Sequence, residues 1–173
     1  MGLKAMSKMA AVAMLAAGML AVPGLAKAQA AGGTVLKPVD MEKMIPPSVY
    51  YKGQTATTQA RNSGGVKFAD GYYVLAFMAD TSGYSTEIAT KYQAYFIVET
   101  PIKVVGKSLP AGVYGIGFVG GKFVITDVGG HDVLTAATGA DPGLKRPLPL
   151  QVTADSSGGY RIYAGRKYVT FTR

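Results

Sequence analysis

The sequence of 173 residues contains no cysteine, no tryptophan and a single histidine, His131. The absence of cysteine excludes disulfide bonds, thiol nucleophiles and thiolate metal sites. One histidine is too few for the usual zinc and copper sites, which use several imidazole ligands. We therefore expect no metal and no cofactor, and a fold whose stability comes from packing and strand pairing.

Acidic residues are also scarce, with ten Asp and Glu against 18 Lys and Arg. They are scattered along the chain, so no two of them are set apart as the acid and base of a glycoside hydrolase. The spacing of Asp127, Asp132 and Asp155 does not match the D-x-[DN]-x-[DN]-G calcium loop. The chain also lacks a GxSxG nucleophile motif and a phosphate-binding glycine loop before a helix.

The first thirty residues predict a secretory signal peptide. Lys4 and Lys8 precede an uncharged apolar run at 9–22, and the Ala-Gln-Ala of residues 28–30 suits a signal peptidase. The alternative is an uncleaved membrane anchor, but the run of 14 residues is shorter than the roughly 20 that a membrane span needs. We expect cleavage after Ala30 and a periplasmic or extracellular location, with membrane contact only through an uncleaved signal peptide.

The remaining chain has the length of one ordinary domain. We expect a linker with a short helix over residues 31–48 and a single β-domain over residues 49–173. Loss of residues 1–30 removes three lysines and no acid, which lowers the net charge from +8 to +5. Because the excess lies beyond residue 100, a basic face could meet an anionic envelope polymer or lipid, although solubility alone also explains it. We expect no nucleic-acid partner.

Short segments rich in Val, Ile, Tyr, Phe and Thr alternate with turns rich in Gly and Pro. This pattern predicts an all-β fold, an antiparallel β-sandwich or a small β-barrel of about nine strands with at most one or two short helices. Residues 72–79 are apolar on both alternating sets, which predicts a central strand covered on both faces. We also expect edge strands at 49–52 and 57–61, a turn at 62–65 and a weak helix at 85–92.

Residues 113–128 predict a β-hairpin with a Gly-Gly turn. In the register that follows from this turn, Phe118 faces Phe123 on the core side. On the other face, Gly115 and Gly117 leave a shallow strip that another backbone segment or a ligand could approach closely.

A second hairpin is predicted over residues 160–172. Its register places Tyr163 opposite Tyr168 on the outer face, with Arg161 beside them. Such an aromatic and basic surface could stack on sugar rings and hold anionic groups. Alternatively, the two tyrosines form a cross-strand pair that stabilises the hairpin, or pack beneath a second sheet.

His131 is the one candidate for acid–base catalysis, paired with Asp132 or Asp127. A lone histidine is more often a turn or packing residue, so the sequence does not select a catalytic site.

The segment GKSLPAGVY at residues 106–114 resembles a hairpin of exported bacterial β-domain proteins of unknown function. The resemblance covers about a dozen residues, implies a β fold and export, and assigns no functional residue.

Three hypotheses follow for the function. The first is an exported, non-catalytic binding module for an envelope glycan, a lipid or a small molecule, with Tyr163, Tyr168, Arg161, Gly115 and Gly117 as ligand-binding candidates. The second is a small hydrolase or isomerase that uses His131. The third is a structural envelope protein that assembles through its sheet edges.

Overall fold

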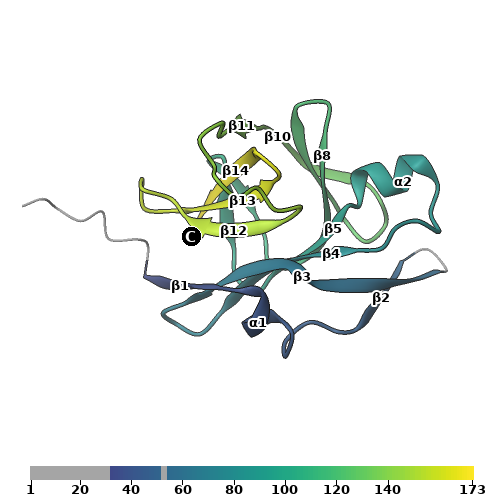
Figure 1. Cartoon of the computed structure of the whole chain (residues 1–173), viewed down its shortest axis with the longest axis horizontal. Coiled ribbons are helices and arrows are strands. Elements are labelled where there is room, and N and C mark those ends of the chain that lie inside the picture. Colours follow the sequence, from purple (N-terminus) through teal and green to yellow (C-terminus); the bar gives the residue numbers. More distant parts are fainter. Residues whose placement is uncertain (1–31, 52–53) are drawn as a thin grey trace, which may run out of the picture.

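The computed structural model describes residues 32–51 and 54–173, and the predicted signal peptide lies outside these residues. The described residues form fourteen strands and two short helices. The strands are arranged in two antiparallel sheets, of eight and six strands (Figure 1). The all-β prediction is confirmed, and the two separate sheets make the fold sandwich-like rather than a closed barrel.

The larger sheet has the strand order β1-β3-β4-β5-β8-β9-β10, with β2 paired to β3. Its strands are β1 (Gly33–Leu36), β2 (Ser48–Tyr51), β3 (Gln54–Phe68), β4 (Tyr73–Ala79), β5 (Ala94–Val98), β8 (Gly112–Val119), β9 (Lys122–Thr126) and β10 (Asp132–Ala137).

The smaller sheet has the order β12-β13-β14-β6-β7, with β11 paired to β14. Its strands are β6 (Ile102–Val104), β7 (Lys107–Leu109), β11 (Gly139–Ala140), β12 (Gln151–Ala154), β13 (Tyr160–Ala164) and β14 (Lys167–Thr172). The helices are α1 (Pro38–Met41) and α2 (Thr86–Lys91). Helix α1 lies on the side of the larger sheet that faces away from the smaller sheet (Figure 1).

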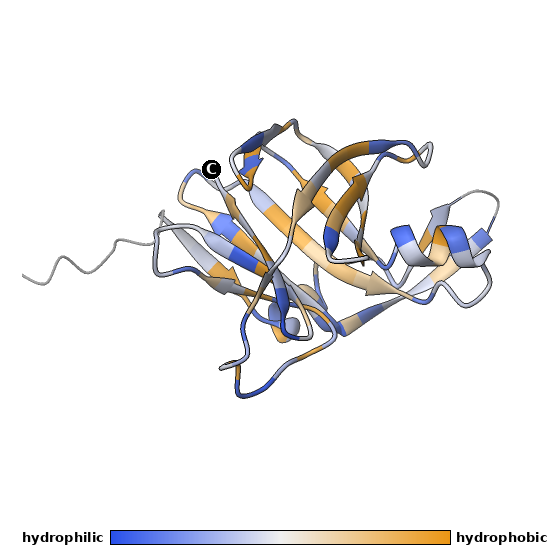
Figure 2. Ribbon diagram, turned by 90° about the horizontal axis from the view of Figure 1, so that it is seen from above, coloured by the Kyte–Doolittle hydropathy of each residue, from blue (hydrophilic) through white to orange (hydrophobic). Residues whose placement is uncertain are grey.

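Strand β4 is buried on both faces, as its sequence predicts. Val74 and Ala76 belong to the core between the two sheets. Leu75 and Phe77 belong to a second apolar cluster, which also contains Met41 of α1. Figure 2 shows the hydrophobic residues along the strands in the middle of the molecule. The larger sheet is therefore a layer between two cores.

The predicted linker and the predicted turn at 62–65 are both corrected. Residues 33–36 of the linker form β1, which pairs antiparallel with the end of β3. The expected turn lies inside β3, next to a break in the strand register between Gln59 and Ser63. Its glycines serve close packing rather than a reversal, because a Cβ added at Gly64 would lie 2.9 Å from the backbone nitrogen of Val152.

The two hairpins form in the predicted register. Phe118 pairs with Phe123 across β8 and β9, and Tyr163 pairs with Tyr168 across β13 and β14. The helix expected at 85–92 is confirmed as α2, with Ser85 as its N-cap. The expected nine strands are too few, because the structure adds very short ones such as β7 and β11.

Candidate functional site

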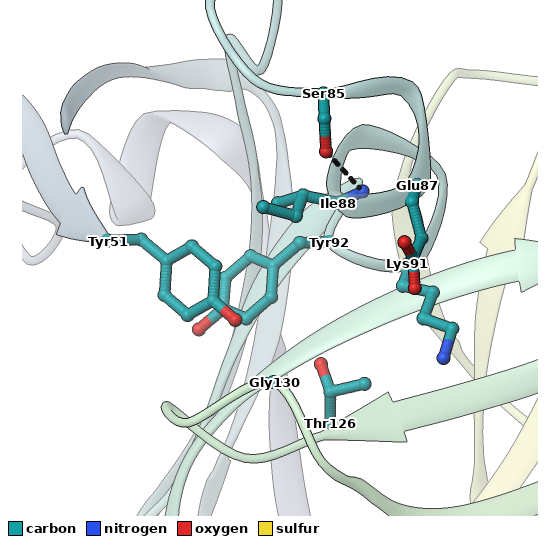
Figure 3. A pocket seen from close by; sticks show the side chains of 8 residues that line it. All are labelled: Tyr51, Ser85, Glu87, Ile88, Lys91, Tyr92, Thr126 and Gly130. Atoms are coloured by element: carbon teal, nitrogen blue, oxygen red, sulfur yellow. Dashed lines mark hydrogen bonds between the residues drawn. The ribbon is translucent and has the colours of Figure 1, made fainter. Parts of the chain in front are cut away.

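A pocket of about 170 Å³ lies between α2, strand β2 and the turn that joins β9 to β10 (Figure 3). We call it the α2 pocket. It is lined by Tyr51, Ser85, Glu87, Ile88, Lys91, Tyr92, Thr126 and Gly130. Three segments that are far apart in the sequence thus meet at one cavity.

The two glycines of the predicted strip hold α2 against the larger sheet. A Cβ added at Gly115 would lie 2.0 Å from the ring of Tyr92, and one at Gly117 would lie 2.5 Å from the carbonyl oxygen of Thr90. Distances this short are far inside van der Waals contact, so only glycine allows the helix end to lie here. The end of α2 therefore occupies the strip. Of the two predicted occupants, another backbone segment or a ligand, the structure shows the backbone segment.

Stacked tyrosines form one wall of the pocket. The rings of Tyr51 and Tyr92 lie 4.4 Å apart and 24° from parallel, and Tyr95 meets Tyr92 edge-on at 5.0 Å. The Tyr95 hydroxyl donates a hydrogen bond to the backbone oxygen of Tyr50 at 3.1 Å, and the Tyr84 hydroxyl donates one to the backbone oxygen of Tyr51 at 2.9 Å. These hydrogen bonds fasten the end of β2 to β5 and to the segment before α2, and they fix the wall.

Burial keeps these tyrosines neutral. It raises the pKa of Tyr92 well above its ordinary value, an effect that the nearby Tyr95 hydroxyl reinforces. It also raises the pKa of Tyr51, with the negative charge of Asp127 adding to the effect. The wall therefore offers hydroxyl groups and aromatic carbon, and no phenolate, at any physiological pH.

Two charged residues of α2 line the pocket. Glu87 and Lys91 both project from α2 into the lining (Figure 3). The ammonium group of Lys91 pairs with Asp132 at 3.1 Å, and both side chains are partly exposed. Asp132 is therefore paired with Lys91 and not with His131, which was one of the two catalytic pairings that the sequence allowed.

His131 contacts Asp127 instead. Its Nδ1 atom lies 3.1 Å from the Asp127 carboxylate, and its backbone N–H donates to the same carboxylate at 2.9 Å. These backbone and ring hydrogen bonds lower the pKa of Asp127 below its ordinary value. The imidazole is 83% exposed, and no serine hydroxyl within the described ranges is hydrogen-bonded to it. The structure thus forms a His–Asp pair without a nucleophile attached to it.

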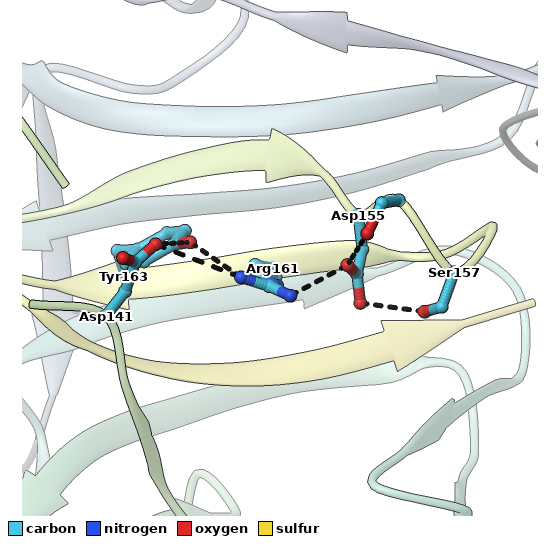
Figure 4. Close-up of polar contacts among 6 residues, drawn as sticks. Asp141, Asp155, Ser157, Arg161 and Tyr163 are labelled. Atoms are coloured by element: carbon cyan, nitrogen blue, oxygen red, sulfur yellow. Dashed lines mark hydrogen bonds and ion pairs between the residues drawn. The ribbon is translucent and has the colours of Figure 1, made fainter. Parts of the chain in front are cut away.

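The outer face of the second hairpin carries a polar network centred on Arg161 (Figure 4). Its guanidinium group pairs with Asp155 at 2.9 Å and donates to the Tyr163 hydroxyl at 3.2 Å. The Tyr163 hydroxyl in turn donates to Asp141 at 3.0 Å, and the guanidinium carbon lies 4.3 Å from the centre of the Tyr168 ring. Arg161, Tyr163 and Tyr168 of the predicted surface are therefore all engaged in contacts within the protein.

The expectation that this face is an open ligand surface is wrong for Tyr163, which is only 3% exposed. The segment that follows β10 pairs as β11 with the edge of β14, opposite Tyr168 and Lys167, so it extends the smaller sheet beside the hairpin. A Cβ at Gly139 would lie 2.5 Å from the Tyr168 ring. The Tyr168 ring therefore lies over the backbone of Gly139 and packs against the Tyr163 ring, with the two ring centres 5.4 Å apart.

Sequence reasoning did not find the α2 pocket, because its walls are separated by dozens of residues. The helix at 85–92 and the glycines of β8 were both recognised as features. Nothing in the local pattern showed that the first lies on the second. The abundance of tyrosine, eleven in the chain, was the available signal, because buried tyrosines need hydrogen-bond partners and gather where such partners are available.

Comparison with protein families, curated proteins and solved structures finds no significant match. Neither helix within residues 32–51 and 54–173 has the length and apolar character that a membrane crossing requires. In the same part of the chain, no three His, Cys, Asp or Glu side chains are grouped so that they could hold a metal ion.

Gly115→Ala is expected to lower the free energy of unfolding by about 1–3 kcal/mol, because the new methyl group forces the Tyr92 ring off β8. Urea denaturation checks this. The control is Gly143→Ala, whose methyl group would meet only an Asp141 oxygen at 3.6 Å and should change stability by less than about 0.5 kcal/mol. Equal stability of the two variants would contradict the packing argument.

Asp155→Asn is expected to cost about 2 kcal/mol at pH 7, because it removes the carboxylate 2.9 Å from the Arg161 guanidinium and leaves only Asp141, at 3.9 Å, as an acidic partner. Burial alone raises the pKa of Asp155, but hydrogen bonds from Ser157 and Arg161 outweigh it and lower that pKa in the folded state below 3.8. The stabilisation is therefore complete above about pH 4 and is lost as pH falls through the folded pKa. Urea unfolding of both proteins from pH 7 to 2.5 should show their difference shrinking; a constant difference speaks against the ion pair.

Proposed function

We propose that this chain is an exported, non-catalytic binding module whose ligand is a small polyhydroxylated molecule, such as one sugar unit of an envelope glycan, held in the α2 pocket. The observation that carries the proposal is the composition of that pocket. It joins a buried aromatic wall to a hydroxyl group from Ser85, a carboxylate from Glu87 and an ammonium group from Lys91.

This combination matches the chemistry of a sugar ring. A pyranose has apolar C–H groups that pack against aromatic carbon and a rim of hydroxyl groups that both donate and accept hydrogen bonds. Glu87 accepts from such hydroxyls and Lys91 donates to them. The Ser85 hydroxyl, whose oxygen accepts the N–H of Ile88, can donate, and the Thr126 hydroxyl, which donates to the backbone oxygen of Gly115, can accept. The pocket of about 170 Å³ is smaller than the roughly 300–1,000 Å³ of sites for drug-sized ligands, which favours a single ring.

Export is the other part of the proposal, and it rests on the first thirty residues. Their positive start, apolar run and Ala-Gln-Ala end support secretion. A protein in the periplasm or outside the cell meets envelope glycans directly, and this agrees with a site built for hydroxyl groups rather than for a nucleotide or a metal-bound substrate.

The test is calorimetric titration of the purified protein with a panel of monosaccharides and short envelope glycans. One saccharide class should bind, and Glu87→Gln should weaken it at least about tenfold, because the amide replaces a charged acceptor worth about 1.5–3 kcal/mol. Lys91→Met should have a similar effect.

Matched controls are Glu42→Gln and Lys43→Met, which alter exposed residues just after α1 and outside the pocket. They should bind as tightly as the parent protein. Absence of saccharide binding, or equal loss in pocket and control variants, would rule out this ligand class at this site.

A second candidate function, a small hydrolase or isomerase, is favoured by the Asp127–His131 pair beside Gly130 of the pocket. The carboxylate at Nδ1 leaves Nε2 directed away from Asp127, the arrangement that a general base requires. This hypothesis predicts that the purified protein turns over an ester or a glycoside. His131→Gln should abolish that turnover, and unchanged activity in this variant would end the hypothesis.

A further inference from the structure

A second and larger groove, of about 450 Å³, runs along the edge strand β10 between two hairpin turns. We call it the lysine groove. One turn joins β6 to β7 and the other joins β8 to β9. The groove is lined by Val105, Lys107, Gly120, Gly121, Lys122, Thr135, Ala136 and Ala137. It shares no lining residue with the α2 pocket.

Val105 holds a strained backbone conformation at this groove. Its φ is 47°, and that of Gly106 is 77°. A two-residue hairpin turn with both φ values positive strongly prefers Asn-Gly or Gly-Gly, because a β-branched side chain crowds its own backbone there. The neighbouring turn follows the preference, with Gly120 and Gly121 at 56° and 78°. Among the described residues other than glycine, Val105 is the one with a positive φ.

The strain presents an apolar side chain to solvent. Val105 is 45% exposed and lines the groove. An asparagine at this position would adopt the turn with less strain and would expose a polar side chain. The valine instead keeps the strained backbone and exposes a hydrocarbon group. Strain that persists at an accessible concave surface is characteristic of ligand sites.

The edge of β10 contributes backbone polar groups. Lys107 donates from its ammonium group to the carbonyl oxygen of Thr135 at 2.7 Å, so that carbonyl points away from β9. In an antiparallel strand both backbone groups of a residue point to the same side, and alternate residues share that side. The N–H groups of Thr135 and Ala137 therefore point toward the groove as well. The bond from Thr138 N–H to Gly121 oxygen agrees with this alternation.

The charges around the groove are of one sign. Lys107 and Lys122 are both exposed, and the lining contains no acidic residue. Two ammonium groups and outward N–H groups therefore lie beside exposed apolar groups, the side chain of Val105 and the methyl group of Ala137, whereas the methyl group of Ala136 belongs to the core.

We propose that the lysine groove binds one molecule of an anionic amphiphile. Lys107 and Lys122 hold its carboxylate or phosphate head, and Val105 packs against the start of its hydrocarbon chain. The site is independent of the proposed function at the α2 pocket. An added β-strand is the less suitable occupant, because the Lys107 side chain already bonds the edge carbonyl of Thr135.

The experiment titrates the purified protein with laurate and with monododecyl phosphate, each below its micelle concentration, and uses dodecanol as the uncharged control. Both anions should bind one to one and dodecanol should not. Lys107→Met with Lys122→Met should weaken binding by at least about tenfold. Lys103→Met, outside the groove, should leave it unchanged.

Val105→Asn separates this site from an accidental charged patch. It should raise the unfolding midpoint by about 2–6 °C, because it relieves the turn, and weaken laurate binding at least about fivefold. Val113→Asn, at an equally exposed valine outside the groove, should do neither. A stabilised variant with unchanged laurate affinity would overturn the proposal.

Two other outcomes would also overturn it. Binding to phosphatidylglycerol vesicles without binding to the monomeric amphiphiles would mean that the groove faces a membrane surface. Binding of a pentaglutamate peptide, with no response to laurate, would mean that the edge of β10 takes an acidic strand. The α2 pocket is tested by saccharides and Glu87→Gln, so failure of one site leaves the other unaffected.

Discussion

The contact between the end of α2 and strand β8 is the constraint on which the α2 pocket depends. Tyr92 lies on Gly115, and the backbone of Thr90 lies on Gly117, at distances that leave no room for a side chain. This contact sets where Glu87 and Lys91 project, and it brings Tyr92 under Tyr51. Tyr92 belongs to the second apolar cluster, which also contains Tyr95, Phe77 and Met41 of α1. A larger residue in β8 would therefore move the helix, the tyrosine wall and the pocket together.

Charge is used differently in the two halves of the molecule. On the outer face of the smaller sheet, Arg161 is enclosed by Asp155, Tyr163 and Tyr168. At the lysine groove, Lys107 and Lys122 have no acidic neighbour in the lining. A buried cation without a partner is costly, whereas an exposed one is free to meet a ligand. Arg161 differs from Lys107 and Lys122 in being enclosed by other side chains, and the type of residue alone does not reveal that difference.

The parts of the fold that could be predicted are those set by local geometry. The register of both hairpins follows from their two-residue turns, and the double burial of β4 follows from apolar residues on both alternating sets. The turn expected at 62–65 was wrong because glycine serves both reversals and close packing, and only the position of Val152 distinguishes them. The strand at 33–36 was missed because a four-residue segment has too short a pattern to separate a strand from a linker.

The sequence by itself determined the all-β class, the hairpins and the absence of thiol and multi-histidine chemistry, because alternation, turn residues and composition act over a few neighbouring positions. Only the tertiary structure decided which surfaces are accessible. It buried Tyr163, filled the glycine strip with α2, paired His131 with Asp127 rather than Asp132, and left Val105 exposed in a strained turn. Each of these outcomes depends on which distant segment packs on a given face, and that is set by the shape of the whole sandwich rather than by the residues beside it in the chain.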